Sequence, residues 1–164
     1  MKLIYLYEII MSISLAVFLT TIACSYNNVS ALVGDQMEDN IQLLNLSKNF
    51  IINLFDQVNN LSNSYQNTLE NENQSFNNNL TRAYETDEYI DNLERIIADA
   101  KEYNLQEEYK PVFNNYIKSL QNEINSYTHY KNYLLTGNNT ENTISMDLLS
   151  KAYDFETEAI KDFN

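Results

Sequence analysis

Beyond residue 40, apolar side chains recur every three or four positions over most of the chain. This spacing places them on one face of an α-helix, so it predicts amphipathic helices that each bury a single stripe. The first stripe begins near Ile41 and continues to Leu69, and no glycine or proline interrupts it. Later stripes of the same kind indicate an all-α fold, in which neighbouring helices bury their apolar faces against one another.

The stretch 70–79, which reads ENENQSFNNN, is the most polar part of the chain. Its composition predicts a break between two helices, while a single long helix over 39–103 is the alternative because the stretch has no proline or glycine. We expect the second helix to begin at Thr86, whose hydroxyl can cap the first turn. Asp87 and Glu88 would follow in that turn, where carboxylates face the positive end of the helix dipole.

Two further helices are predicted towards the C-terminus. Pro111 suits the first turn of the earlier one, since proline has no backbone N–H to leave unpaired there. Gly137 and the two asparagines after it are typical of a helix C-terminus. We expect the last helix to run from Thr143 to Phe163. Helices of similar length with short connections favour antiparallel neighbours, so the sequence predicts an up-and-down bundle of three or four long helices.

The N-terminus carries an uncharged apolar run from Ile9 to Ala23. It is roughly 15 residues long, whereas a helix needs about 20 to cross a membrane, so it is closer to the core of a signal sequence than to a permanent span. The residues Thr21-Ile22-Ala23-Cys24 resemble the lipobox of prokaryotic lipoproteins, with Thr21 in place of a large aliphatic residue. This resemblance implies that Cys24 is acylated and becomes the new N-terminus.

Two other fates of this segment stay open. Cleavage after Ala31 is one, because Val29-Ser30-Ala31 is similar to a signal-peptidase site. An uncleaved N-terminal anchor helix is the other. We divide the chain into a signal sequence or membrane anchor over 1–24, a spacer over 25–38 and a helical bundle domain over 39–164. Lipid or the N-terminal helix would hold the bundle at the extracytoplasmic face of the cell membrane.

The chain is acidic, with 23 Asp and Glu residues against 10 Lys and Arg residues and a formal net charge of −13. Lys2 and Glu8 cancel each other, so the exported part keeps the whole of this charge. The charge argues against nucleic acids and anionic lipid surfaces, because phosphate binding needs basic side chains. We expect the membrane, through the N-terminus, and an unidentified protein as partners, with a homo-oligomer as another way to complete the core.

Few residues could carry out catalysis. Cys24 is the single cysteine, and the chain has no nucleophile elbow and no glycine-rich phosphate-binding loop. His129 is the single histidine, and Ser126 occupies the position where a bundle metal site needs a glutamate. We expect His129 to be a surface residue that points toward solvent, because no partner motif accompanies it. The sequence therefore predicts no catalytic residue, no cofactor and no metal site, and the domain is not expected to be an enzyme.

Two clusters of side chains have both a functional and a structural interpretation. The carboxylates of residues 85, 87, 88 and 91 could bind calcium, but they lack the ligand spacing and central glycine of an EF-hand. They fit an acidic, solvated helix start better. Exposed tyrosine rings could bind sugars or a protein. Tyr116, Tyr127 and Tyr130 lie on the core stripe, however, which favours packing, with each hydroxyl reaching the edge.

Asn138 is the candidate glycosylation site. It begins an Asn-x-Thr sequon beside Gly137, in a turn that we expect to be exposed. Sequons arise easily in a chain so rich in asparagine, so this one matters only where the host glycosylates exported proteins.

These observations favour a membrane-tethered, extracytoplasmic helical bundle that works as a structural or interaction module without catalysis. The alternative is a small-ligand-binding sensor, because an anchor helix followed by four long helices resembles, in architecture, the periplasmic sensing part of chemoreceptors. That resemblance implies a partner that relays the signal. An enzyme would need a large pocket with several buried carboxylates on facing helices, and a filled core would argue against it.

Overall fold

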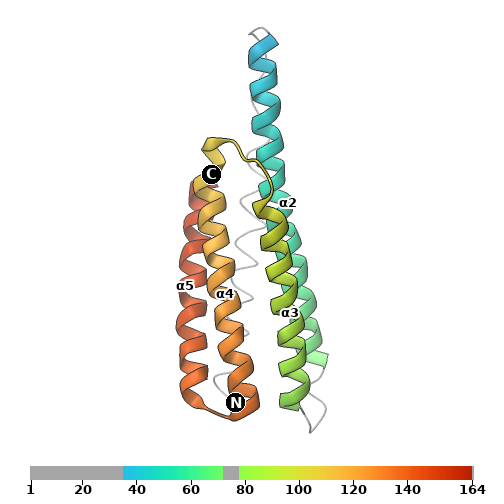
Figure 1. Ribbon diagram of the computed structural model, residues 1–164, viewed down its shortest axis with the longest axis vertical. Coiled ribbons are helices and arrows are strands. Elements are labelled where there is room, and N and C mark those ends of the chain that lie inside the picture. The colour runs from blue at the N-terminus through green and yellow to red at the C-terminus, as the bar shows by residue number, and fades with distance from the viewer. Residues whose placement is uncertain (1–34, 72–77, 164) are drawn as a thin grey trace. The chain divides into compact units, whose positions relative to one another are not determined.

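The computed structural model describes residues 35–71 and 78–163, which are helical apart from short connections (Figure 1). Its elements are α2 (Asp35–Asn71), α3 (Asn78–Lys101), the 3₁₀ turn η3 (Glu107–Tyr109), α4 (Lys110–Thr136) and α5 (Asn139–Phe163). The part of the chain from Asp39 onwards forms one compact unit. The described ranges contain four α-helices and no strand, which confirms the predicted all-α class.

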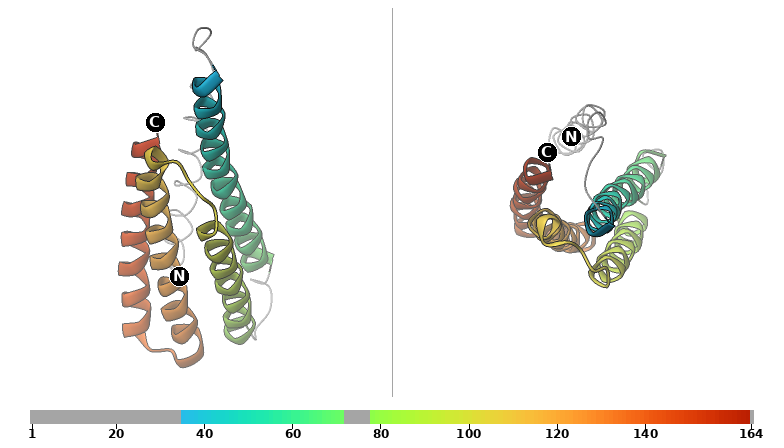
Figure 2. Two further views of the ribbon diagram at one scale, coloured as in Figure 1. Left: turned by 45° about the horizontal axis from the view of Figure 1, so that its top comes forward. Right: turned by 90° about the horizontal axis from the view of Figure 1, so that it is seen from above.

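The four helices pack as a bundle in which successive helices run in opposite directions (Figure 1). The view from above shows α4 between α3 and α5, and α4 packs against both of them (Figure 2). Side chains of α2 also reach α4, where the rings of Phe55 and Tyr116 meet edge to face with centroids 4.3 Å apart. The helix α4, whose ends are marked by Pro111 and Gly137, therefore contacts all three of the other α-helices.

The predicted stripes supply the core. Each helix buries apolar residues at helical spacing, and these positions exclude water because they face neighbouring helices. The buried apolar residues are Ile51, Leu54, Phe55, Val58 and Tyr65 of α2, Ala83, Tyr89, Ile90, Leu93, Ile96, Ile97 and Ala100 of α3, Val112, Tyr116, Ile117, Leu120, Tyr127 and Leu134 of α4, and Ala152 and Ala159 of α5.

Both predicted ends of α4 are confirmed. Pro111 lies in its first turn, and Gly137 caps its last turn with a left-handed φ of 69°. The N–H of Gly137 donates to the carbonyl of Tyr133 at 2.8 Å, which satisfies one of the carbonyls left open at the helix end. Glycine suits this position because it has no Cβ to clash in the left-handed region.

The predicted start of the last helix was wrong by four residues, because α5 begins at Asn139 and not at Thr143. The side chain of Asn138 accepts a hydrogen bond from the N–H of Thr140 at 3.0 Å, so it caps the first turn. The apolar stripe of α5 begins only at Ile144, because the first turn of the helix is polar. The residues of that turn therefore show no helical periodicity in the sequence.

The predicted cap at Thr86 was also wrong. The second helix begins at Asn78, so Thr86 lies inside α3 and is fully buried. Its hydroxyl donates to the carbonyl of Arg82 at 2.6 Å, the bond to the preceding turn that lets threonine occupy a helix interior. The prediction of two helices in place of one long helix is confirmed, since α2 ends at Asn71 and α3 runs back antiparallel to it (Figure 1).

The predictions for the N-terminal segment lie outside the described residues. These are the signal sequence or anchor helix, the lipid attachment at Cys24 and the cleavage after Ala31. The helix α2 begins at Asp35, inside the stretch predicted as a spacer. Within the ranges that the structure describes, no helix is both long enough and apolar enough to cross a membrane.

Candidate functional site

Small side chains line the contact between α4 and α5. Ser119 and Ser126 of α4 are buried and lie seven residues apart. Ser145, Ala152 and Ala159 of α5 are also buried and have the same spacing. Positions seven apart share one face of a helix, and small residues there let two helices approach closely. We call these five residues the small-residue seam.

Hydrogen bonds to backbone carbonyls hold the small-residue seam together. The hydroxyl of Ser119 donates to the carbonyl of Ala152 at 2.7 Å. One heptad further on, the hydroxyl of Ser126 donates to the carbonyl of Ser145 at 2.8 Å, and the two serine hydroxyls lie 3.1 Å apart. Since Ser126 has a single proton, Ser145 is the donor between the hydroxyls. The seam therefore contains no titratable group.

A cluster of three tyrosine rings fills the centre of the bundle between α2, α3 and α4. Tyr65 and Tyr89 stack with centroids 4.5 Å apart and an interplanar angle of 16°. Tyr127 meets both edge to face, at 5.4 Å from Tyr65 and 5.0 Å from Tyr89. All three are buried, so the predicted packing role of Tyr127 is confirmed. We call this group the tyrosine cluster.

A chain of hydrogen bonds runs from the tyrosine cluster to a carboxylate. The hydroxyl of Tyr89 donates to Oε1 of Glu123 at 2.7 Å and lies 2.7 Å from the hydroxyl of Ser62. A phenol has one proton, so Ser62 donates to Tyr89 and Tyr89 donates to Glu123. The chain thus connects one residue each from α2, α3 and α4, three helices that contribute to the same core.

Two carboxyl groups lie on the inner side of the α4–α5 pair. Burial raises the pKa of Glu123 from 4.5 to about 7, the hydrogen bond from Tyr89 works against this rise, and the charge of Glu156 adds to it. Burial likewise raises the pKa of Glu156 from 4.5 to about 7. Both residues keep some accessible surface, but protein atoms surround their carboxyl groups closely enough to disfavour the charged form.

Tyr116 lies near both of these carboxyl groups. Burial, followed by the charges of Glu156, Glu123 and Asp56, raises its pKa well above the ordinary value of 10.0. Burial, and then the charge of Glu123, does the same to the pKa of Tyr89. The phenols therefore stay protonated at any physiological pH. Among the described residues, no basic side chain forms an ion pair with Glu123 or Glu156.

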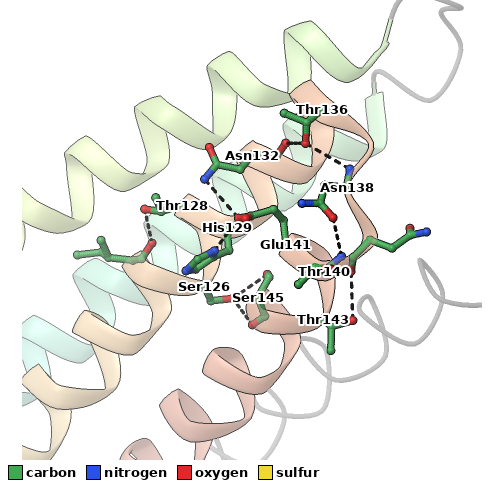
Figure 3. A network of polar contacts seen from close by, with 12 residues as sticks. Ser126, Thr128, His129, Asn132, Thr136, Asn138, Thr140, Glu141, Thr143 and Ser145 are labelled. Atoms are coloured by element: carbon green, nitrogen blue, oxygen red, sulfur yellow. Dashed lines mark hydrogen bonds and ion pairs between the residues drawn. The ribbon is translucent and has the colours of Figure 1, made fainter.

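A second polar network surrounds the turn between α4 and α5 (Figure 3). His129 Nδ1 lies 2.7 Å from Oε2 of Glu141, and the side-chain amide of Asn132 donates to the same oxygen at 3.4 Å. The hydrogen bond with His129 is the main cause that lowers the pKa of Glu141. These groups are partly exposed and lie at the outer edge of the turn.

His129 keeps part of its surface accessible, as expected of a surface residue, but it has a partner that no sequence motif indicated. The side chain is half-buried, and Glu141 is its partner. The sequence analysis placed Glu141 before the last helix, whereas α5 begins at Asn139 and holds Glu141 in its first turn. A carboxylate there faces the positive end of the helix dipole, as well as the histidine ring.

The other candidate residues are not brought together. Asn138 is exposed, and its side chain caps α5. Of the four clustered acidic residues, Asp87 forms an ion pair with Lys131, while Glu88 and Asp91 are exposed. The residues that the structure describes include no group of three or more acidic, histidine or cysteine side chains that could hold a metal ion.

Sequence reasoning missed Glu123 and Glu156. A signal was present, because Glu123 lies three residues after Leu120 and four before Tyr127, on the face that the stripe predicts to be buried. Glu156 lies in the same way between Ala152 and Ala159. An acidic residue that interrupts an apolar stripe can be buried, and both glutamates interrupt a stripe in this way.

Comparisons with known proteins give no further guide to this site. No family model, no curated protein and no solved structure matches the chain.

Proposed function

We propose that the chain is a membrane-tethered, extracytoplasmic helical bundle that works as a non-enzymatic structural or interaction module. Its N-terminal segment holds it at the membrane, through lipid on Cys24 or as an uncleaved anchor helix. An unidentified protein is the partner of the bundle itself. The proposal rests on the fold, on the surface of the first turns of α2 and on the contents of the core.

The first turns of α2 carry the observation that supports tethering most directly. The hydroxyl of Ser47 accepts a hydrogen bond from the backbone N–H of Gln106 at 3.2 Å, so Ser47 lies level with the connection between α3 and α4. The turns before it project beyond that connection. They expose Ile41, Leu43 and Leu46, with relative accessibilities of 52%, 45% and 48%.

Part of this projecting end carries no charge. The stretch 40–47 contains no charged residue, although the chain as a whole carries a net charge of −13. Asp35, Glu38 and Asp39 precede this stretch in α2, so the uncharged turns lie just inside the end of the helix. Exposed apolar residues at Ile41, Leu43 and Leu46 are compatible with a position next to a membrane. The opposite end of the bundle, with the turn at Gly137, would then face away from the membrane.

The centre of the bundle supports a role without catalysis. The rings of Tyr65, Tyr89 and Tyr127 contact one another and are buried, which occupies the place where a bundle enzyme would hold its substrate. The carboxyl of Glu123 accepts a hydrogen bond from the buried phenol of Tyr89. The groups present can pack and exchange protons.

A ligand-binding sensor is the second candidate function. The observation in its favour is the pair of enclosed carboxyl groups of Glu123 and Glu156, on facing helices. A ligand that binds the folded state raises its melting temperature. A thermal-shift screen with amino acids, sugars and organic acids at high concentration would support the sensor if one compound gave a reproducible rise, and would count against it if none did.

The mature protein from its native cell tests the main proposal. Its mass and N-terminal residue would be measured, together with its distribution between membrane and soluble fractions. A chain that begins at acylated Cys24, or an intact chain in the membrane fraction, agrees with tethering. A chain that begins at Leu32 would indicate release from the membrane, and an intact chain wholly in the cytosol would contradict export altogether.

The variant Cys24→Ser separates the two kinds of tether. Under lipidation, it should lose the lipid mass and stay uncleaved at that position. Under an uncleaved anchor, it should behave like the wild type in fractionation and in mass, apart from the substitution. Ser25→Ala, which changes the neighbouring residue and leaves the thiol in place, is the matched control.

A further inference from the structure

We propose that Leu80, Tyr84 and Leu135 form a docking surface for a basic amphipathic helix of a partner protein. Leu80 and Tyr84 lie in the first turns of α3 and Leu135 lies in the last turn of α4, at the same end of the bundle (Figure 1). We call these three residues the turn-end patch. The inference rests on the proposed role as an interaction module, and it does not depend on how the N-terminus is attached to a membrane.

The turn-end patch consists of large apolar side chains that the bundle leaves exposed. Leu80 is 57% exposed, Tyr84 is 68% exposed and Leu135 is 53% exposed. Single exposed apolar residues are common on protein surfaces, whereas several of them in one place mark an interaction site. The meaning of these three side chains therefore depends on whether they share one edge of the bundle.

The ion pair between Lys131 and Asp87 shows how α3 and α4 are aligned. Leu80 lies seven residues before Asp87, so it points in nearly the same direction from α3. Leu135 lies one turn after Lys131, on the same side of α4. Because the helices are antiparallel, both steps lead towards the same end of the bundle, by about 10 Å along α3 and about 6 Å along α4. With Tyr84 between Leu80 and Asp87, the turn-end patch lines one edge of the α3–α4 contact.

Carboxylates continue this edge along α3. Three exposed residues, Glu88, Asp91 and Glu94, follow Tyr84 at intervals of four, three and three positions. We call them the acidic rim. They form no ion pair with another residue of the described ranges. Arg95, the basic residue next to the rim, donates to the side chain of an asparagine at 2.6 Å. The rim therefore carries more negative than positive charge.

The acidic rim decides which occupant fits the turn-end patch. An amphipathic helix can lay a row of apolar side chains on exposed leucine and tyrosine residues, and lysine or arginine residues on its flank would then meet the rim. A second copy of the chain would bring its own net charge of −13 close to the first, so the two copies would repel each other. The charges therefore favour a basic partner protein over self-association.

A synthetic peptide tests the proposal with the full chain in a non-ionic detergent. The probe is a helix of about 18 residues, or five turns, with leucine on one face and lysine on the other. In the control peptide, glutamate replaces every lysine. Fluorescence anisotropy of the labelled peptides measures each dissociation constant, and samples without protein give the contribution of the micelles. We expect the lysine peptide to bind roughly tenfold more tightly or better. Equal binding of the two peptides, or no binding of the lysine peptide, would overturn the proposal.

Two pairs of serine substitutions locate the site. Leu80→Ser with Leu135→Ser removes both leucines of the turn-end patch. Leu43→Ser with Leu46→Ser is the matched control, because these two exposed leucines lie in the projecting turns of α2. The first variant should bind the lysine peptide roughly tenfold more weakly than the wild type, and the control should differ from it by less than about twofold. Equal affinities for the two variants would show that the peptide does not bind at the patch.

The double substitution Glu88→Gln with Asp91→Asn tests the acidic rim. Its affinity for the lysine peptide should fall by about threefold, and its binding should depend less on salt, because fewer charges attract the peptide. Asp154→Asn with Glu158→Gln makes the same chemical change at exposed positions of α5 and is the matched control. If the rim variant and the control kept the same affinity and the same salt dependence, the choice of a basic partner would be wrong.

Methyl NMR of the wild type gives an answer even if a variant does not fold. When the lysine peptide is added, the leucine methyl signals of Leu80 and Leu135 should shift and that of the buried Leu93 should not. Shifts confined to other leucines would contradict the proposal. Sedimentation without peptide identifies the other occupant: a dimer that Leu80→Ser with Leu135→Ser dissociates would assign the patch to a second copy and overturn the proposal. These tests and membrane fractionation can fail separately, so the patch and the tether are judged independently.

Discussion

The two sides of α4 are built in contrasting ways. Towards α5, the contact consists of small residues whose hydroxyls bond to backbone carbonyls, as between Ser126 and Ser145 at 2.8 Å. Towards α2 and α3, it consists of large rings and a carboxyl group, as between Tyr89 and Glu123 at 2.7 Å. The first contact is short-range and does not titrate, and the second is bulky and contains ionisable groups.

This difference gives the two faces of one helix opposite sensitivities to a change in side-chain volume. Close approach makes the small-residue seam sensitive to added volume, because there is no space for more atoms. The tyrosine cluster is sensitive to removed volume, because each ring fills a large part of the centre.

Removal of a ring from the tyrosine cluster should have the largest effect. Tyr127→Ala leaves a cavity between two other rings, and we expect a loss of about 3–5 kcal/mol in the free energy of unfolding. Urea unfolding followed by circular dichroism would measure it. Tyr84→Ala is the control, since Tyr84 is 68% exposed and should change the stability by no more than about 0.5 kcal/mol. Equal losses in the two variants would contradict the central place of the cluster.

Added volume in the small-residue seam should come next. Ala152→Leu inserts a branched side chain opposite Ser119, whose hydroxyl bonds to the carbonyl of residue 152. We expect a loss of about 1–3 kcal/mol, because α4 and α5 must move apart. Ala98→Leu, at an exposed position of α3, is the control and should be close to neutral. A stabilised Ala152→Leu variant would show that the seam contains unused space.

The turn that joins the two helices of the seam should give the smallest effect of the three. A Cβ at Gly137 would meet no atom within 4 Å, so the substitution Gly137→Ala adds no clash with a neighbour. The left-handed φ of 69° alone should cost about 1–2 kcal/mol. Gly137→Asn should lose less, since asparagine tolerates this region better. If thermal unfolding gave equal midpoints for glycine, alanine and asparagine, the left-handed cap would not matter.

Helix ends that are marked by a proline or a glycine could be predicted from the sequence. Pro111 and Gly137 mark the ends of α4 by their backbone chemistry, which depends little on the rest of the fold. The stripes also predicted that the rings of Tyr116 and Tyr127 are buried, whereas Tyr130, placed on the same stripe, is only partly buried. These features depend mainly on residues that are close in the sequence, so they can be predicted from a single sequence.

Features that depend on a neighbouring helix could not be predicted in the same way. Threonine is a common capping residue, but Thr86 lies inside α3. Its hydroxyl donates to the backbone carbonyl of Arg82 and is hydrogen-bonded to the hydroxyl of Tyr65 in α2. The pairing of His129 with Glu141 depends on a helix start set by Asn138. Likewise, the high pKa of a glutamate such as Glu123 is caused by the helices around it, not by its neighbours in the sequence.

Hydrogen exchange of the full chain, compared between the wild type and Tyr127→Ala, tests the contrast between the two sides of α4 most directly. We predict that backbone amides near Ser62 and Tyr89 lose protection in the variant, while amides near Ser145 and Ala152 keep theirs. An equal loss in both regions, or no loss in either, would contradict the account.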